Sequence, residues 1–167
     1  MKIVGQLVAY AAFIILLGVF STWPELRLMA ADEANVWISF SHAAGRVGEC
    51  RRLSQEELMA LPPNMRKPDD CPRERHPLHV ILMMDEQTLY QATMPPTGLW
   101  ADGKSTVYQR FRVAAGVHIF SIYMNDSGKP GSFDFENSAT ISLLAGQNLV
   151  VYFDANNQQL RFSREAP

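Results

Sequence analysis

The longest apolar run of the chain lies at its N-terminus. Between residues 3 and 20 the only strongly polar side chain is Gln6, so a helix built from this stretch is apolar on every face. A helix of about 18 residues at ~1.5 Å per residue spans ~27 Å, close to the ~30 Å hydrocarbon core of a bilayer. Trp23 suits the headgroup level, and Pro24 ends the helix. The pattern predicts a single transmembrane helix that contacts the membrane through residues 3–23.

From residue 35 onward apolar side chains recur at every second position, which is the period of a β-strand. Strands are predicted at residues 36–41, 78–84, 87–94, 105–113, 117–124, 139–143, 148–154 and 160–162. The side chains predicted to fill the core are Val36, Ile38, Phe40, Val80, Leu82, Phe111, Val113, Ile119, Ile141, Leu149, Val151 and Phe153. About eight short strands with close turns, and one short helix, predict an all-β sandwich.

Two of the predicted turns share a local pattern. Residues 113–118 read Val-Ala-Ala-Gly-Val-His, and residues 143–148 read Leu-Leu-Ala-Gly-Gln-Asn. In both, glycine supplies the positive φ that a tight hairpin needs, so each segment is predicted to join two paired strands. These segments resemble hairpins of immunoglobulin-like and PEGA-type extracytoplasmic modules. The resemblance implies an immunoglobulin-like or PEGA-like β-sandwich and implies no activity.

Residues 42–76 depart from the strand pattern. The segment contains both cysteines, four prolines and seven of the 15 basic residues of the chain. Ser54 and Glu57 have the spacing of a capping box at the start of a short helix, which Pro62 and Pro63 end. We interpret the segment as a structured insertion between the first two strands of the sandwich.

The residues after the apolar run bear on whether it is retained. A cleaved signal peptide is the alternative, but the run is long for one, and Glu25 and Arg27 stand where a cleavage region is normally uncharged. The small-residue site at residues 28–30 has a large Leu three positions before the cut. We therefore expect three parts: an anchor at 1–24, a juxtamembrane linker at 25–34, and an extracytoplasmic sandwich at 35–167.

Charge and cysteine content predict the side of the membrane. Lys2 and the amino terminus precede the span, whereas acidic residues follow it, so the positive-inside rule places the N-terminus in the cytoplasm. The even cysteine count predicts a Cys50–Cys71 disulfide, which agrees with an oxidising compartment. The chain is expected to be a single-pass protein of the inner (cell) membrane with a periplasmic domain.

Composition and motifs argue against several functions. The net charge is −2 with no long run of either sign, which argues against a nucleic-acid surface. No G-x-S-x-G motif occurs, and Ser41-His42 has no orienting third group, so the chain is not expected to be an enzyme or to bind a small-molecule substrate. No cofactor is expected, and twenty residues between the cysteines exclude a C-x-x-C redox motif.

Two alternative functions stay open. A copper- or haem-handling accessory factor would draw its ligands from Cys50, Cys71, His42 and His76, although a metal site needs three or four groups that converge. A carbohydrate- or peptide-binding module would instead use an aromatic face. Its candidate residues are Trp37, Tyr90, Trp100, Tyr108, Tyr123, Phe133 and Phe135.

The favoured hypothesis is a membrane-anchored, non-catalytic interaction or accessory protein, a subunit or assembly partner of an envelope or respiratory complex. The insertion would be its docking surface, because a strand-poor insertion of about 35 residues is uncommon without a function. The arginines predicted to meet partner carboxylates are Arg51, Arg52, Arg66, Arg73 and Arg75. The competing interpretation pairs them inside the insertion with Glu56, Glu57, Asp69, Asp70 and Glu74.

Overall fold

A computed structural model describes residues 2–23 and 30–164. The chain divides into two compact units, Met1–Ala31 and Asp32–Pro167. The charged residues and the cleavage-site residues predicted between 25 and 30 lie, apart from Ala30, outside the described residues.

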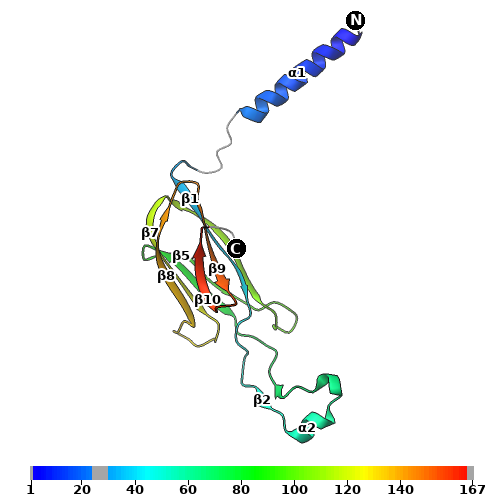
Figure 1. Ribbon diagram of the computed structural model, residues 1–167, viewed down its shortest axis with the longest axis vertical. Helices are drawn as coiled ribbons and strands as arrows, with labels where there is room; N and C mark the ends of the chain where they lie inside the picture. Colours follow the sequence, from blue (N-terminus) through cyan, green and yellow to red (C-terminus); the bar gives the residue numbers. More distant parts are fainter. Residues whose placement is uncertain (1, 24–29, 165–167) are drawn as a thin grey trace. The chain divides into compact units, whose positions relative to one another are not determined.

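The first unit contains helix α1, Lys2–Thr22 (Figure 1). No residue of this helix is buried. Its 21 residues are long and apolar enough to cross a membrane, with a mean hydropathy of 2.4 over an 18-residue window. Length and composition are those of either a membrane span or an N-terminal signal sequence.

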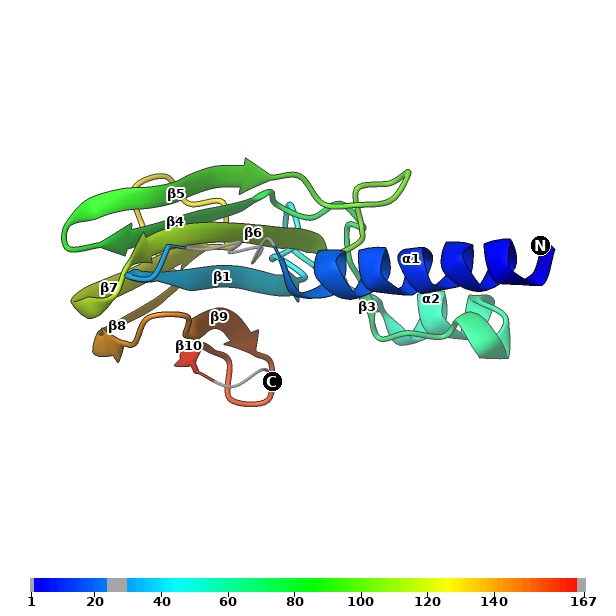
Figure 2. The same cartoon turned by 90° about the horizontal axis from the view of Figure 1, so that it is seen from above.

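The second unit is built from two four-stranded sheets (Figures 1 and 2). One has the strand order β10-β9-β1-β6, in which β1 pairs with β9 in parallel and with β6 antiparallel. The other has the order β5-β4-β7-β8 and is antiparallel throughout. The strands are β1 (Glu33–His42), β4 (Leu78–Met84), β5 (Gln87–Met94), β6 (Ser105–Ala114), β7 (Gly116–Asn125), β8 (Phe135–Leu143), β9 (Asn148–Asp154) and β10 (Gln159–Ser163).

The core lies between the inward faces of both sheets. Alternation along β1 buries Val36, Ile38 and Phe40, and alternation along β4 buries Val80 and Leu82, as predicted. The remaining predicted core residues that are buried are Val113, Ile141, Leu149 and Val151, while Phe111 and Phe153 are partly buried against the same cluster. Fully burying each such side chain contributes roughly 1.5–3 kcal/mol, so this interface supplies most of the folding free energy of the domain.

Ile119 is the exception, because it is 55% exposed. The prediction that it belongs to the core is wrong: β7 carries apolar side chains on both faces, and the structure turns Phe120, Ile122 and Met124 inward instead. The register of β7 against β4 places Ile122 beside Leu82 and Met124 beside Val80, so these side chains share the inward face.

The two Ala-Gly turns are not hairpins, which corrects that prediction. β6 and β7 belong to different sheets, as do β8 and β9, so residues 114–116 and 144–147 carry the chain from one sheet to the other. The short turns that do join paired strands are Asp85-Glu86 and residues 155–158.

The immunoglobulin-like topology is not confirmed. In immunoglobulin constant domains the second and third strands lie in opposite sheets. Here β4 and β5, the second and third strands of the sandwich, are joined by a two-residue turn and pair directly in the same sheet.

The insertion lies between β1 and β4 and forms its own small element. It contains β2 (Arg51–Arg52), helix α2 (Gln55–Ala60), a 3-10 turn η1 (Pro63–Met65) and β3 (Asp69–Asp70). β2 pairs with β3 antiparallel. The predicted capping box is present, since Ser54 Oγ accepts from the Glu57 amide at 3.3 Å and the Ser54 amide donates to Glu57 Oε2 at 2.8 Å.

All the long connections of the domain emerge at the end opposite Asp32, which we call the distal end. β1 leaves Asp32 and runs about 30 Å before the insertion begins. The 95–104 connection between β5 and β6 and the 126–134 connection between β7 and β8 emerge at the same end, as the pairing His42–Ser105 and Met124–Phe135 requires. Figure 2 shows the insertion, with β3 and α2, beyond the ends of the sheet strands.

Candidate partner-docking site

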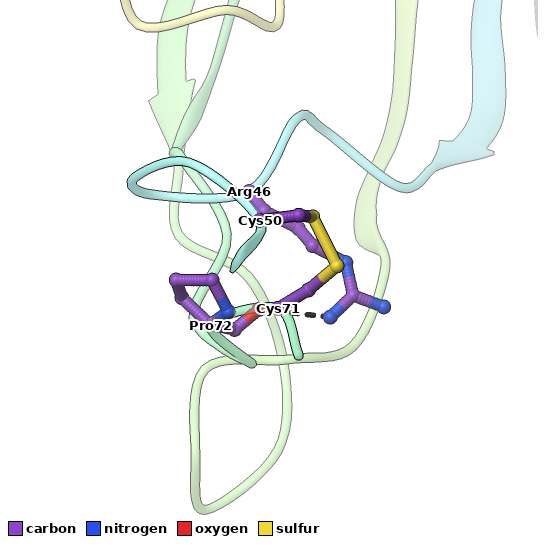
Figure 3. The surroundings of a disulfide bond; sticks show 4 residues. All are labelled: Arg46, Cys50, Cys71 and Pro72. Carbon is purple, nitrogen blue, oxygen red and sulfur yellow. Dashed lines mark hydrogen bonds between the residues drawn. A yellow bond between two sulfur atoms is a disulfide. The ribbon is translucent and has the colours of Figure 1, made fainter. Parts of the chain in front are cut away.

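A disulfide closes the insertion, as the sequence predicted. Cys50 and Cys71 are bonded, with their Cα atoms 4.2 Å apart, next to the short ladder of β2 and β3. Arg46 lies beside the bridge and donates from Nη1 to the main-chain oxygen of Pro72 at 2.8 Å (Figure 3). The disulfide closes this proline-rich insertion, which has few strands, into a loop.

The neck of the insertion consists of residues 44–47 and 74–76. Main-chain hydrogen bonds join these two segments to each other and to the domain. The Val47 amide donates to the oxygen of Glu74 at 2.9 Å, and the His76 amide donates to the oxygen of Gly45 at 2.9 Å. The Gly45 amide reaches the oxygen of Asp126, in the 126–134 connection, at 2.9 Å. The insertion is therefore attached to the sandwich by a short paired stem.

Arg75 joins the neck to the 95–104 connection. Its Nη1 donates to the main-chain oxygen of Ala44 at 2.6 Å, and its Nε donates to that of Asp102 at 3.0 Å. Its own amide donates to the oxygen of Ala101 at 2.9 Å. The Asp102 carboxylate in turn lies 3.5 Å from Arg73 Nε. The insertion and the 95–104 connection consequently form one surface.

The 95–104 connection presents an exposed leucine–tryptophan pair. Thr97 braces its base, because its oxygen accepts from the Gly103 amide at 2.8 Å and its hydroxyl donates to Lys104. A Cβ at position 103 would lie 2.7 Å from that Thr97 oxygen, so only glycine fits there. At the tip Leu99 is 92% exposed and Trp100 is 65% exposed.

Met59 and Met65, on the insertion, are also exposed. In the structure the insertion spans residues 43–77 and not 42–76, because His42 is the last residue of β1 and β4 begins at Leu78. We call this insertion, together with the tip, residues 98–101, the distal surface. A hollow in this surface is lined by Asp102, which follows the tip in the sequence, and by the insertion residues Arg46, Met65, Lys67, Pro68, Asp69, Asp70, Cys71, Arg73 and Arg75. Large apolar side chains thus stand among charges of both signs, a composition found at protein-binding surfaces.

The five predicted partner-binding arginines divide into two groups. Arg75 is committed to the neck, and Arg66 donates to the main-chain oxygens of Leu61 at 3.0 Å and Met59 at 3.3 Å, at the C-terminal end of helix α2. Arg51 pairs with Glu57 at 2.8 Å.

The remaining two arginines are more open. Arg73 is 73% exposed at its side chain, although its Nε lies 3.5 Å from the Asp102 carboxylate, and Arg52 is exposed and makes no ion pair with another described residue. Arg73 and Arg52 are therefore the members of the predicted set most available to carboxylates of a partner.

The Arg51–Glu57 pair links β2 to the first turn of α2. The hydrogen bond from Arg51, followed by the one from the Ser54 amide, lowers the pKa of Glu57 to about 2. The same hydrogen bond raises the pKa of Arg51. Both groups are fully charged at neutral pH, but they are solvent-exposed, so their attraction is screened and weak.

The residues of the alternative metal site are not brought together. Cys50 and Cys71 are consumed in the disulfide, and His42 Nε2 lies 2.7 Å from Asp126 Oδ2 while its ring packs on Phe153 at 4.4 Å between centroids. His76 lies against Gly128. Within residues 2–23 and 30–164, no three His, Cys, Asp or Glu side chains converge to hold a metal ion.

The candidate aromatics do not share one face. Trp37 and Tyr108 lie on the outer side of β1 and β6, where Arg110 stacks over the Trp37 ring at 5.3 Å from its centroid. Tyr123, on β7 of the other sheet, forms a separate pair with Phe133 of the 126–134 connection. Tyr90 and Phe135 pack against the core, and Trp100 lies on the distal surface.

Asn125 begins a glycosylation sequon, Asn-Asp-Ser, at residues 125–127. Its side chain is buried, and Nδ2 donates to the main-chain oxygens of Lys129 and Ser132 while Oδ1 accepts from the Gly128 amide. The folded domain therefore uses this amide to shape the 126–134 connection and does not expose it for modification.

Sequence reasoning did not single out Leu99, whose exposure the structure shows. A signal was present, because an apolar pair stands between Pro95-Pro96 and Gly103, inside a segment that has no strand period. No known protein-family model and no curated protein sequence matches this chain.

Proposed function

We propose that this chain is a membrane-anchored, non-catalytic docking protein whose distal surface binds a partner protein outside the cytoplasm. The proposed partner is a subunit of an envelope or respiratory complex. The anchor is α1, retained after export with its N-terminus in the cytoplasm, and the disulfide supports the oxidising side of the membrane for the domain.

The observation that carries the proposal is the exposure of Leu99 and Trp100 on a braced turn beside the disulfide-closed insertion. Exposing such a pair to water is unfavourable, since each apolar side chain forgoes roughly 1.5–3 kcal/mol of burial. Tryptophan and arginine are the side chains that most often dominate binding energy at protein interfaces. Because the turn and the insertion are already ordered, little conformational entropy is lost when a partner docks.

Charge supports a protein partner over a lipid surface. The hollow of the distal surface is lined by Arg46, Lys67, Arg73 and Arg75 but also by Asp69, Asp70 and Asp102. A surface for anionic lipid would carry basic groups with few acids. Mixed charge around an apolar pair instead fits a partner with an apolar pocket and a polar rim of both signs.

The test is co-purification of the full-length chain from detergent-solubilised membranes, with recovered proteins quantified by mass spectrometry. Leu99→Ser with Trp100→Ala should reduce recovery of a specific partner at least tenfold, because hot-spot truncations cost about 2 kcal/mol or more. Arg52→Glu with Arg73→Glu should also weaken recovery. Tyr108→Ala, an exposed aromatic on the outer side of β6, is the matched control and should leave recovery unchanged.

Two outcomes would reject the proposal. One is equal recovery of every protein by the wild type and by both distal-surface variants. The other is a loss of recovery that follows unfolding, shown by a lowered melting temperature of the variant. Binding of the purified chain to lipid vesicles that depends on Trp100 would instead assign the distal surface to a membrane.

A further inference from the structure

The outer face of sheet β5-β4-β7-β8 carries an apolar stripe that the proposed function does not use. β7 points Val117, Ile119 and Tyr123 outward, and β4 adds Ile81 and Met83 beside them, since Ile81 pairs with Tyr123 across the strands. Val117 is 68% exposed and Ile119 is 55% exposed. The stripe therefore follows the two central strands of the sheet.

Uncharged polar side chains flank this stripe on both sides. The pairing registers place Thr88 and Gln91 on β5 and Ser138, Thr140 and Ser142 on β8 beside the outward residues of β4 and β7. Among the residues that the pairing registers place beside the stripe, the charged one is Glu136, which lies opposite Tyr123 on the edge strand β8. An apolar centre with a polar rim is the anatomy of a protein interface.

The outer face of the other sheet has a different character. Its strands carry Arg110 and Arg112 on β6, Arg161 on β10 and Asp154 on β9. A face with such charges repels a copy of itself unless opposite charges happen to align. We call the outer face of sheet β5-β4-β7-β8 the β4–β7 face. A two-fold axis through its centre places the apolar and hydroxyl groups of one copy against those of the other, without bringing like charges together.

We propose that a second copy of this chain covers the β4–β7 face, so that the protein is a two-fold symmetric dimer. Four strands about 4.8 Å apart and about nine residues long at ~3.4 Å each give a face of roughly 19 Å by 30 Å, about 600 Å². Two such faces bury about 1,200 Å² in total, which reaches the lower limit of specific interfaces. Confinement of both copies to one membrane raises their effective concentration and offsets this modest area.

Disulfide trapping tests the dimer directly in membranes. The only two cysteines of the chain are bonded to each other, so one introduced cysteine is the only free thiol. Ile119→Cys and Ser121→Cys sample the centre of the face on β7, Ser138→Cys samples the edge strand β8, and Ser39→Cys and Thr106→Cys on the outer side of β1 and β6 are the controls. After mild oxidation, at least one central variant should give a band of twice the monomer mass at five times or more the control yield.

A charge-insertion arm checks the same face without a thiol. Ile119→Glu brings two carboxylates together near the axis and should convert the full-length chain in detergent from dimer to monomer, as measured by sedimentation. Tyr108→Glu should leave the dimer intact. Melting temperatures within about 3 °C of the wild type exclude unfolding as the cause.

Three results would overturn the dimer: a monomeric wild type, trapping that is equal at the β4–β7 face and at the control positions, or an adduct whose mass shows a different protein on the face. None of them bears on the distal surface. Loss of partner recovery by the Leu99 and Trp100 variants is a separate measurement, so either conclusion can fail alone.

Discussion

Arg75 donates from Nη1 to the main-chain oxygen of Ala44 at 2.6 Å, which ties the segment entering β4 to the segment leaving β1. Its Nε reaches the main-chain oxygen of Asp102 at 3.0 Å, so one side chain also holds the 95–104 connection. An exposed docking arginine was predicted at this position, and the structure uses the guanidinium as an internal clamp. Among the arginines of the distal surface, Arg75 is thus the one whose loss we expect to lower the stability of the fold.

We therefore predict that Arg75→Met lowers the free energy of unfolding by about 2–3 kcal/mol, because hydrogen bonds from a charged group contribute about 1.5–3 kcal/mol each and the carbonyls lose a donor. Urea denaturation measures the change. Arg73→Met is the matched control: its side chain is 73% exposed, and the loss should stay below about 0.5 kcal/mol. Equal losses in the two variants would show that Arg75 is not a clamp.

Helix α1 is predicted to remain on the mature protein. It is 21 residues long with an apolar surface throughout, and the residues that follow it in the sequence form a poor cleavage site. Intact mass spectrometry of protein extracted from membranes should find residues 1–24 present. A mature N-terminus near Ala31 would show that the helix is a signal sequence and would remove the membrane confinement invoked for the dimer.

How far the sequence predicted the fold depends on which features are local. The capping box of Ser54 and Glu57 and the two-residue Asp85-Glu86 turn are decided by neighbours in sequence, and both were predicted correctly. The Ala-Gly turns have the same local signal whether the next strand pairs beside the last one or crosses to the other sheet. That choice is made by distant partners, β4 for β7 and β1 for β9.

The same limit explains Ile119. Residues 117–124 are apolar on both faces, so a period of two does not say which face turns inward.

For the candidate site, the even cysteine count was enough to predict the Cys50–Cys71 bridge. The Leu99–Trp100 tip has no periodicity, and its joining to the insertion through Arg75 depends on three segments that are far apart in the chain.

Removing the disulfide should loosen the insertion and spare the sandwich. The buried hydrophobic core contains no residue between Ala44 and Leu78 among those described, so the closed loop is peripheral to it. We expect Cys50→Ser with Cys71→Ser to accelerate proteolysis at least tenfold within residues 53–67, because the loop-closure term of about 3 kcal/mol acts on local opening. The circular dichroism melting temperature should fall by less than about 5 °C. Collapse of the β-sheet spectrum would show that the insertion is integral to the core.

The last prediction concerns acid stability and rests on Asp85. Its Oδ2 lies 2.6 Å from His118 Nδ1, and its Oδ1 accepts from the Ile119 amide at 2.9 Å. The hydrogen bond from His118, followed by that from Ile119, lowers the pKa of Asp85 below its ordinary value. A carboxylate with a lowered folded pKa stabilises the fold fully above the unfolded pKa, about 3.9 for aspartate, and this stabilisation is lost as pH falls toward the folded pKa.

Asp85→Asn removes that charge while keeping a residue that tolerates the left-handed turn conformation, φ +48°. The variant should be less stable than the wild type at pH 6, and its free energy of unfolding should fall less steeply between about pH 4 and pH 2. Urea titrations at half-unit pH steps measure both slopes. Glu86 lies in the same turn and makes no ion pair in the described chain. Glu86→Gln should therefore reproduce the wild-type slope. If Asp85→Asn keeps the wild-type slope, then the contacts of His118 and Ile119 do not couple this turn to acid unfolding.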